Sequence, residues 1–348
     1  MNELVRSGFR PWHLPPKSQL EKQRHQAHVE QVLLHSSGGM SPGHAREAEQ
    51  RALDALWRTE LMTQEELVLT PQMRRLWEEY GLPSQFVRSV IWPSDIVYGS
   101  LKPRRTPPHS PPMAFEKGKK FELQPEALKL IKLDVARTLP FLGQMKDSEN
   151  SEKCVEMLCD FSKKAHREYT QGMSYICVRL MIEFNFDKPK TLRCLERILL
   201  RSPTIACLYR LEVQRIKLSV EFILEAIAWD NIPRVWLKFK NFKFQSVDFF
   251  FLEWALTMFV KNFGLKISGL VFDLFFLQGD IAIYKSAVAM LSLLEDQILA
   301  QPDIEDIRRV INDAGGTVMV DDFIKAFHDV KVSETVISLL EQSEFFTD

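Results

Sequence analysis

The apolar positions of this chain recur mainly at helical spacing. From residue 125 onward they follow intervals of three and four, which place them on one face of an α-helix. The clearest period lies in "MSYICVRLMIEF", whose apolar face is formed by Met173, Ile176, Cys177, Leu180, Met181 and Phe184. Alternating strand patterns are scarce, and we find no convincing repeat of about 30–45 residues. The pattern predicts an all-α protein.

Start and stop signals for helices divide the N-terminal part of the chain. Ser41-Pro42 and Thr70-Pro71 each offer an N-cap followed by proline at the first helical position, and Gly81 offers a stop. Residues 1–40 are polar and irregular. We therefore expect three regions. They are a partly disordered extension with one or two helices over 1–70, a main helical domain over 71–330, and a C-terminal helix or tail over 331–348.

One segment of the main domain departs from the helical pattern. Residues 101–120, "LKPRRTPPHSPPMAFEKGKK", contain five prolines and six lysines or arginines against one glutamate. Crowded prolines favour an extended, solvated loop. A tolerated insertion is the simpler interpretation. The functional interpretation is a basic arm that contacts a membrane or an acidic partner, with Lys117, Lys119 and Lys120 as candidate partner-binding residues.

Composition mainly excludes classes of function. A net charge of −1 gives no reason to expect nucleic acid as a partner. The five cysteines are scattered without the spacing of a zinc site, which is typical of reduced, buried thiols in a cytosolic protein. We expect no metal site. The expected location is the cytoplasm, with peripheral attachment to endomembranes as an open alternative.

The most apolar run is "FFFLEWALTMFV", residues 249–260. It is too short to cross a bilayer as a helix, and it carries Glu253. We therefore predict a buried helix over this run.

The first candidate for chemistry is "IKLDVARTLP", residues 131–140. Proline disfavours helix at the residue before it, so Pro140 predicts a helix end near Arg137 and Thr138. Asp134 and Arg137 are three residues apart and share one helix face, so that Asp134 could direct Arg137. The simpler interpretation is a cation that stabilises the C-terminal end of a helix.

The second candidate is "REYTQGMSYI", residues 167–176. The helical period begins at Met173, so Thr170 is the predicted N-cap, and Gln171 and Gly172 form the entry to the helix. Gly172 lacks a Cβ and would let another backbone come close. For Gln171 a surface position is the simpler interpretation, and Tyr169 is expected to be a core or boundary aromatic residue.

Three signature motifs of self-contained enzymes are missing. The chain contains no GxxxxGK[ST], HExxH or GxGxxG sequence. Arginine and glutamine at helix ends are poor nucleophiles, but they are suited to stabilising charge and orienting water.

Together the two candidate segments resemble the motifs of the TBC-domain GTPase-activating proteins that act on Rab GTPases. The IxxDxxRTxP motif is matched by Ile131, Asp134, Arg137, Thr138 and Pro140, and the YxQGM motif by Tyr169, Gln171, Gly172 and Met173. Weaker similarity in residues 81–92 and 270–279 extends the resemblance to about residues 75–330. In the second of these segments, Leu270 and Phe272 replace a basic residue and a tryptophan of the family pattern.

The resemblance implies a multi-helix TBC domain that accelerates GTP hydrolysis by a GTP-bound Rab, as in vesicle trafficking. Arg137 would be the arginine finger and Gln171 the glutamine finger. The implied supporting residues are Asp134, Thr138, Tyr169 and Gly172, and Arg88 is a candidate for packing or for partner binding. Mg²⁺ and GTP would belong to the partner, so the chain would carry no cofactor of its own.

Two alternatives remain open. The first is a TBC domain that binds a Rab as an effector or scaffold without accelerating hydrolysis. The second is a helical scaffold whose motif matches are accidental. The chain has no catalytic site that works alone, so whether it is to be counted as an enzyme is also left open.

Overall fold

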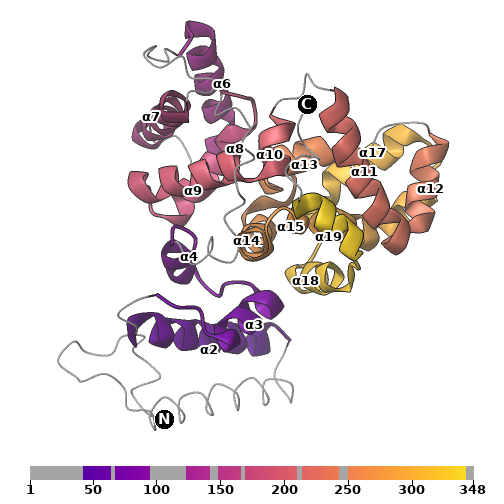
Figure 1. Ribbon diagram of the computed structural model, residues 1–348, viewed down its shortest axis with the longest axis horizontal. Helices are drawn as coiled ribbons and strands as arrows, with labels where there is room; N and C mark the ends of the chain where they lie inside the picture. Colours follow the sequence, from indigo (N-terminus) through magenta and orange to yellow (C-terminus); the bar gives the residue numbers. More distant parts are fainter. Residues whose placement is uncertain are drawn as a thin grey trace. The chain divides into compact units, whose positions relative to one another are not determined.

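The structure, a computed structural model, describes residues 42–63, 67–94, 123–141, 148–165, 169–209, 214–242 and 250–341 (Figure 1). Every regular element in these ranges is helical, which confirms the all-α class. The chain forms two compact units, Met1–Ile96 and Val97–Asp348. The expected division at residue 70 stays a prediction.

Three helices are described in the first unit: α2 (Pro42–Thr63), α3 (Pro71–Tyr80) and α4 (Gln85–Ile91). The predicted limits of α3 are confirmed. Thr70 Oγ1 accepts a hydrogen bond from the Met73 N–H at 3.1 Å, and Gly81 ends the helix with φ 74°. Trp57 and Trp77 are fully buried with their rings edge to face, 6.3 Å between centroids. This aromatic pair holds α2 against α3.

The described elements of the second unit are α6 (Pro125–Phe141), α7 (Ser148–Ala165), α8 (Met173–Glu183), α9 (Lys188–Arg201), α10 (Pro203–Leu208), α11 (Gln214–Asn231), α12 (Pro233–Asn241), α13 (Leu252–Leu256), α14 (Val260–Gln278), α15 (Ile281–Leu293), α16 (Glu295–Ala300), α17 (Ile304–Asp313), η3 (Ala314–Gly316), α18 (Val320–Asp329) and α19 (Glu334–Glu341).

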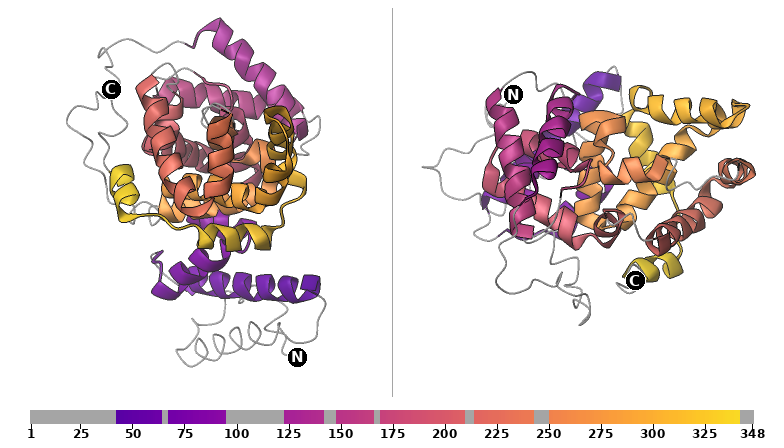
Figure 2. Two further views of the ribbon diagram at one scale, coloured as in Figure 1. Left: turned by 90° about the vertical axis from the view of Figure 1, so that its right-hand side faces the viewer. Right: turned by 90° about the horizontal axis from the view of Figure 1, so that it is seen from above.

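Helix α14 joins the two halves of this unit. Helices α6 to α9 pack against one another, while α11, α14 and α18 pack against α15 (Figures 1 and 2). Helix α14 contacts both α8 and α15. A second link runs from the Thr204 N–H at the start of α10 to Asp280 Oδ2, at 2.6 Å. The residues of α6 and α8 therefore rest on a continuous helical core.

The core of the second unit is rich in aromatic side chains. Phe251 and Tyr284 are stacked with 5.1 Å between centroids, and Trp254 meets Phe263 edge to face at 4.9 Å. All four are buried. Among the described cysteines, Cys154, Cys177 and Cys194 are buried as predicted, whereas Cys159 is half-buried. In the part of the chain that the structure describes, no helix combines the length and apolar character that crossing a bilayer requires.

The described part of the apolar run, residues 250–260, is mostly buried, as predicted, but it is not one helix. Helix α13 ends at Leu256, a turn follows, and α14 begins at Val260. Met258 and Phe259 in this turn have φ 47° and 63°, and both are fully buried. A bulky residue rarely adopts positive φ, so the surrounding packing must impose it. Apolar periodicity cannot reveal such a break, because residues on both sides of it are buried.

Helix α6 continues past the point where Pro140 was expected to end it. The helix runs from Pro125 to Phe141. The clash between a proline ring and the residue before it disfavours helix without excluding it, and in a last turn the missing N–H removes only one helical hydrogen bond. Arg137 therefore lies one turn inside the C-terminal end of the helix.

A close backbone contact at Gly315 gives a prediction about stability. A Cβ on Gly315 would lie 1.8 Å from the carbonyl oxygen of Asn262 and 2.9 Å from its carbonyl carbon. Gly315→Ala must therefore separate η3 from α14, and we expect it to lower the free energy of unfolding by about 1–3 kcal/mol. Thermal or urea unfolding measures the loss.

The neighbouring glycine provides the control. A Cβ on Gly316 would meet no atom within 4 Å. We expect Gly316→Ala to change the free energy of unfolding by less than about 0.5 kcal/mol. Equal stability of the two variants would contradict the proposed close contact.

Candidate functional site

The candidate site is organised by one buried carboxylate. Asp134 lies on the inner face of α6 and is only 1% exposed. Its Oδ1 pairs with the Arg137 guanidinium, and its Oδ2 accepts a hydrogen bond from the Tyr169 hydroxyl at 2.7 Å. The two carboxylate oxygens of Asp134 therefore connect the IxxDxxRTxP motif to the YxQGM motif, which is far away in sequence.

Arg137 is exposed even though its partner is buried. The side chain of Arg137 is 53% exposed, against 2% for that of Asp134. The predicted pairing on one helix face is confirmed. A carboxylate that is itself fixed by Tyr169 limits the directions that the guanidinium can take, while most of that cation stays available to a partner.

Thr138 attaches α6 to α8. Its Oγ1 donates a hydrogen bond to the carbonyl oxygen of Asp134 at 2.7 Å and lies 2.9 Å from Ser174 Oγ. Thr138 and Ser174 are both completely buried. Ser174 was missed in the sequence, where the only signal was a polar residue beside the apolar face of the helix.

Gln171 lies in a tight turn before α8. The Met173 N–H donates to the Thr170 carbonyl at 3.2 Å, which closes a four-residue turn with Gln171 and Gly172 at its centre. Gly172 has φ 106° and ψ −25°, close to the third position of a type II turn, which requires positive φ. Gln171 occupies the second position of the turn, and its side chain is exposed.

The prediction that Thr170 caps α8 with its side chain is wrong. The N-cap of α8 is Gly172, and no side-chain hydrogen bond caps the helix. The turn uses the carbonyl group of Thr170 instead. Capping propensity identified a polar residue near the helix start, but the positive φ of glycine places the N-cap two residues further on.

Glycine is needed at position 172 because of its backbone conformation, and a clash of a larger side chain with its neighbours is the lesser reason. A Cβ there would lie 3.6 Å from the Leu256 carbonyl oxygen and 3.8 Å from Thr257 Cγ2, which are ordinary contact distances. Positive φ is what disfavours other residues at this position. The Leu256 carbonyl also accepts a hydrogen bond from the Tyr209 hydroxyl at 2.7 Å. The turn that carries Gln171 and Gly172 therefore lies against the C-terminal end of α13.

Tyr169 acts as a neutral hydrogen-bond donor. Burial raises the pKa of its phenol well above the ordinary value; a hydrogen bond with Ser174 opposes this rise, and the hydrogen bond with Asp134 adds to it. The phenol therefore keeps its proton at physiological pH and can donate it to the Asp134 carboxylate.

A second cluster of charged and polar side chains is centred on Glu253. Glu253 accepts hydrogen bonds from Lys261 and from Asn262, the latter at 2.8 Å. Burial acts to raise the pKa of Glu253, but these hydrogen bonds outweigh it and hold the pKa below its ordinary value.

Tyr175 connects the two clusters electrostatically. Burial raises the pKa of its phenol, and the charges of Lys261 and Arg137 both lower it. Sequence analysis did not single out Tyr175 or Lys261. The signal that could have found Lys261 is Glu253, a charged residue inside an apolar run that needs a partner.

The other candidate residues are less informative. Arg88 is half-buried on α4, with its guanidinium 5.8 Å from the centroid of the Trp92 ring, as expected of a packing contact. Its role in partner binding stays a prediction. Lys117, Lys119 and Lys120 lie outside the described residues.

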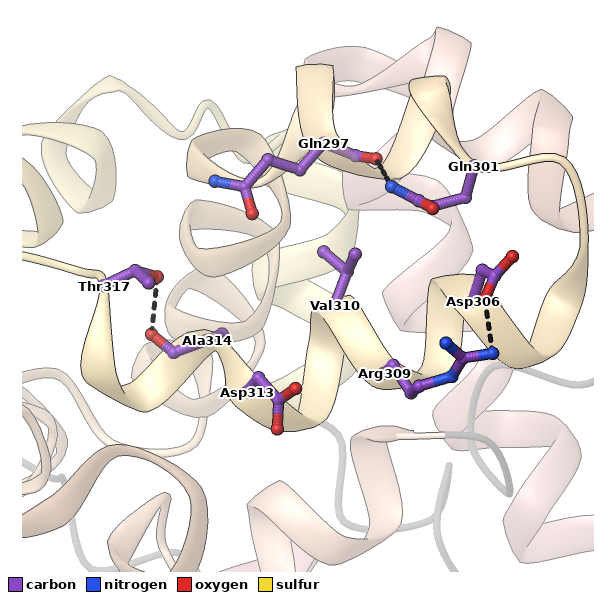
Figure 3. A pocket seen from close by; sticks show the side chains of 8 residues that line it. All are labelled: Gln297, Gln301, Asp306, Arg309, Val310, Asp313, Ala314 and Thr317. Carbon is purple, nitrogen blue, oxygen red and sulfur yellow. Dashed lines mark hydrogen bonds and ion pairs between the residues drawn. The ribbon is translucent and has the colours of Figure 1, made fainter.

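A polar hollow of about 370 Å³ lies among α16, α17 and η3 (Figure 3). Asp306 and Arg309 form an ion pair on its α17 side, and the Gln301 side chain donates to the Gln297 carbonyl. None of the residues that line it belongs to the motifs above. We therefore assign the hollow no part in the site.

The Rab-GTPase-TBC domain model matches residues 85–299, so the chain belongs to this family. TBC1 domain family member 12 of Xenopus tropicalis is 23% identical over 337 residues, which cover 87% of this chain and 47% of that protein. Human TBC1 domain family member 14 is 26% identical over 180 residues, covering 51% of this chain and 25% of that protein. The chain thus matches about half or less of the length of these relatives.

The fold agrees with this assignment. A crystal structure of the Chlamydomonas flagellar RabGAP TBC domain aligns with a TM-score of 0.60 at 16% identity, covering 92% of this chain and 99% of that chain. At this identity the similarity concerns the fold alone.

Proposed function

We propose that this chain is a GTPase-activating protein for a GTP-bound Rab-family GTPase. In this proposal Arg137 and Gln171 enter the nucleotide site of the partner. The partner supplies GTP and Mg²⁺, and this chain supplies side chains only. The observation that carries the proposal is the Asp134 carboxylate, which bonds both to Arg137 and to Tyr169, two residues before Gln171.

The proposed role of Arg137 is to stabilise charge. Phosphoryl transfer spreads negative charge over the phosphate oxygens in its transition state, so a cation already held in place lowers the barrier. The guanidinium is planar and carries several donors, which suits it to contact more than one oxygen. Its exposure and its pairing with a buried carboxylate support this role.

The proposed role of Gln171 is to orient the attacking water. A neutral carboxamide can accept from water and donate to a neighbouring oxygen at the same time. A turn closed by a backbone hydrogen bond limits the movement of the residue that carries this side chain. Correct positioning of a nucleophile is a large part of the catalysis of phosphoryl transfer.

Single-turnover GTP hydrolysis across a panel of GTP-loaded Rabs tests the proposal. We expect wild type to accelerate at least one Rab, and Gln171→Ala to lose roughly 10²-fold of that acceleration because the water is no longer oriented. Gln297→Ala is the matched control, since Gln297 is also exposed but lies on α16. This control should keep full acceleration.

The outcomes separate the alternatives. Binding of GTP-loaded Rabs without acceleration would favour the effector or scaffold function. Acceleration that survives Gln171→Ala would refute the role of Gln171. The cytoplasmic location and the membrane contact through residues 101–120 stay predictions, and equal vesicle binding after loss of Lys117, Lys119 and Lys120 would exclude that contact.

A further inference from the structure

The outer face of α6 carries a continuous exposed stripe. Its members follow the spacing i, i+3, i+4, i+7 and i+8, which places them on one side of the helix, and all of them are exposed. We name this set the α6 stripe: Lys129, Lys132, Leu133, Ala136 and Arg137. The opposite face of the helix is buried against α7 and α8, so the direction of the stripe is fixed by packing.

Leu133 is the apolar member of the stripe, one helical turn before Arg137. It is 58% exposed. Single exposed leucines are common on protein surfaces, so exposure alone indicates nothing. Its position is informative because α-helical geometry puts it only about 6 Å along the axis from Arg137 and on the same side. Any partner that receives the Arg137 side chain must also come close to Leu133.

A shallow hollow of about 400 Å³ lies beside Leu133. It is lined by Pro125, Leu128, Lys129, Lys132 and Leu133. Apolar side chains and the aliphatic stems of two lysines thus form its wall. An apolar group of a partner could be covered there while the two ammonium groups stay in water.

The stripe is positively charged. Neither Lys129 nor Lys132 forms an ion pair within the described part of the chain, and none of the five members is acidic. Two lysines and one arginine at successive turns favour a partner surface rich in carboxylates. Lys129 is about 12 Å along the axis from Arg137, a separation well within a protein interface of ordinary size.

We propose that the α6 stripe docks the GTPase next to its nucleotide site, with Leu133 in contact with an apolar spot and Lys129 and Lys132 facing carboxylates. This inference rests on the proposed function, because continuity with Arg137 identifies the partner. Docking by these residues sets the affinity of this chain for the GTPase and its selectivity among GTPases. Arg137 itself acts on the chemical step.

Steady-state kinetics with the preferred GTP-loaded Rab test the docking. We expect Leu133→Ala to raise KM several-fold with little change in kcat, since it removes contact made before and during the reaction. We expect the double variant Lys129→Glu, Lys132→Glu to raise KM by about tenfold or more at low salt. Added salt should reduce this effect because it screens exposed charges.

Matched controls exclude general effects of removing an exposed leucine and of reversing the charge of two exposed lysines. Leu237 on α12 is 54% exposed, so Leu237→Ala removes a comparable leucine elsewhere. The pair Lys325→Glu, Lys331→Glu reverses two exposed lysines in and just after α18. Both controls should keep the wild-type KM.

The results distinguish this inference from the proposed function. If Arg137→Ala loses activity while both stripe variants keep the wild-type KM, the docking surface is refuted and the proposed function stands. If Arg137→Ala keeps full activity, the proposed role of Arg137 fails, and the docking inference, which rests on continuity with Arg137, fails with it. If the lysine reversal weakens binding to anionic lipid vesicles and leaves KM unchanged, a lipid surface replaces the GTPase as the partner of the stripe.

Discussion

Replacing Arg137 with alanine is expected to reduce the accelerated rate of GTP hydrolysis by about 10³- to 10⁵-fold, the range found for arginine fingers supplied to a GTPase. The side chain is 53% exposed and makes its ion pair with Asp134 within its own helix, so its removal should leave the fold intact. Single-turnover hydrolysis measures the loss, and thermal unfolding checks that the variant is folded.

Arg137→Lys separates charge from geometry. Lysine keeps the positive charge but loses the planar fork of donors, so we expect it to recover only a small part of the lost rate. Full activity of this variant would mean that a point charge is sufficient.

Helix α17 provides a matched control for Arg137. Arg309 pairs with Asp306 at the same i, i+3 spacing, and its side chain is 74% exposed. Arg309→Ala therefore removes an equivalent local ion pair at a different place. We expect it to retain wild-type acceleration. A similar loss in both variants would show that Arg137 acts through general stability or net charge, not through the nucleotide.

Replacing Asp134 with alanine is expected to reduce the acceleration by roughly 10²-fold, because the guanidinium would no longer be held in one direction. The same change leaves the buried Tyr169 hydroxyl without its carboxylate partner. We therefore also expect the free energy of unfolding to fall by about 1–3 kcal/mol. Activity is to be measured well below the melting temperature.

Tyr169→Phe separates positioning from stability. It removes the same hydrogen bond to Oδ2 but leaves the pair between Asp134 Oδ1 and Arg137 in place. We expect a stability loss of about 1 kcal/mol and a much smaller loss of activity than in Asp134→Ala. If both variants lose activity in proportion to stability, Asp134 has no separate positioning role.

Sequence reasoning was most successful where local rules decide the structure. The limits of α3 were predicted from Thr70 and Gly81, because capping bonds depend only on neighbouring residues. The pairing of Asp134 with Arg137 was predicted from helical spacing for the same reason. Sequence reasoning was least successful at two places. At the end of α6 the helix tolerates a proline, and in the apolar run at 249–260 a turn with buried side chains interrupts the helix.

By itself, the sequence determined the helical class, the two motifs and the residue types suited to charge stabilisation, since periodicity and spacing are properties of the chain alone. Only the tertiary structure decided how the motifs are connected. The bond from Tyr169 to Asp134, the contact between Thr138 and Ser174 and the support of Gly172 by Leu256 join segments that are remote in sequence. Such contacts depend on how helices pack in space, which no local pattern specifies.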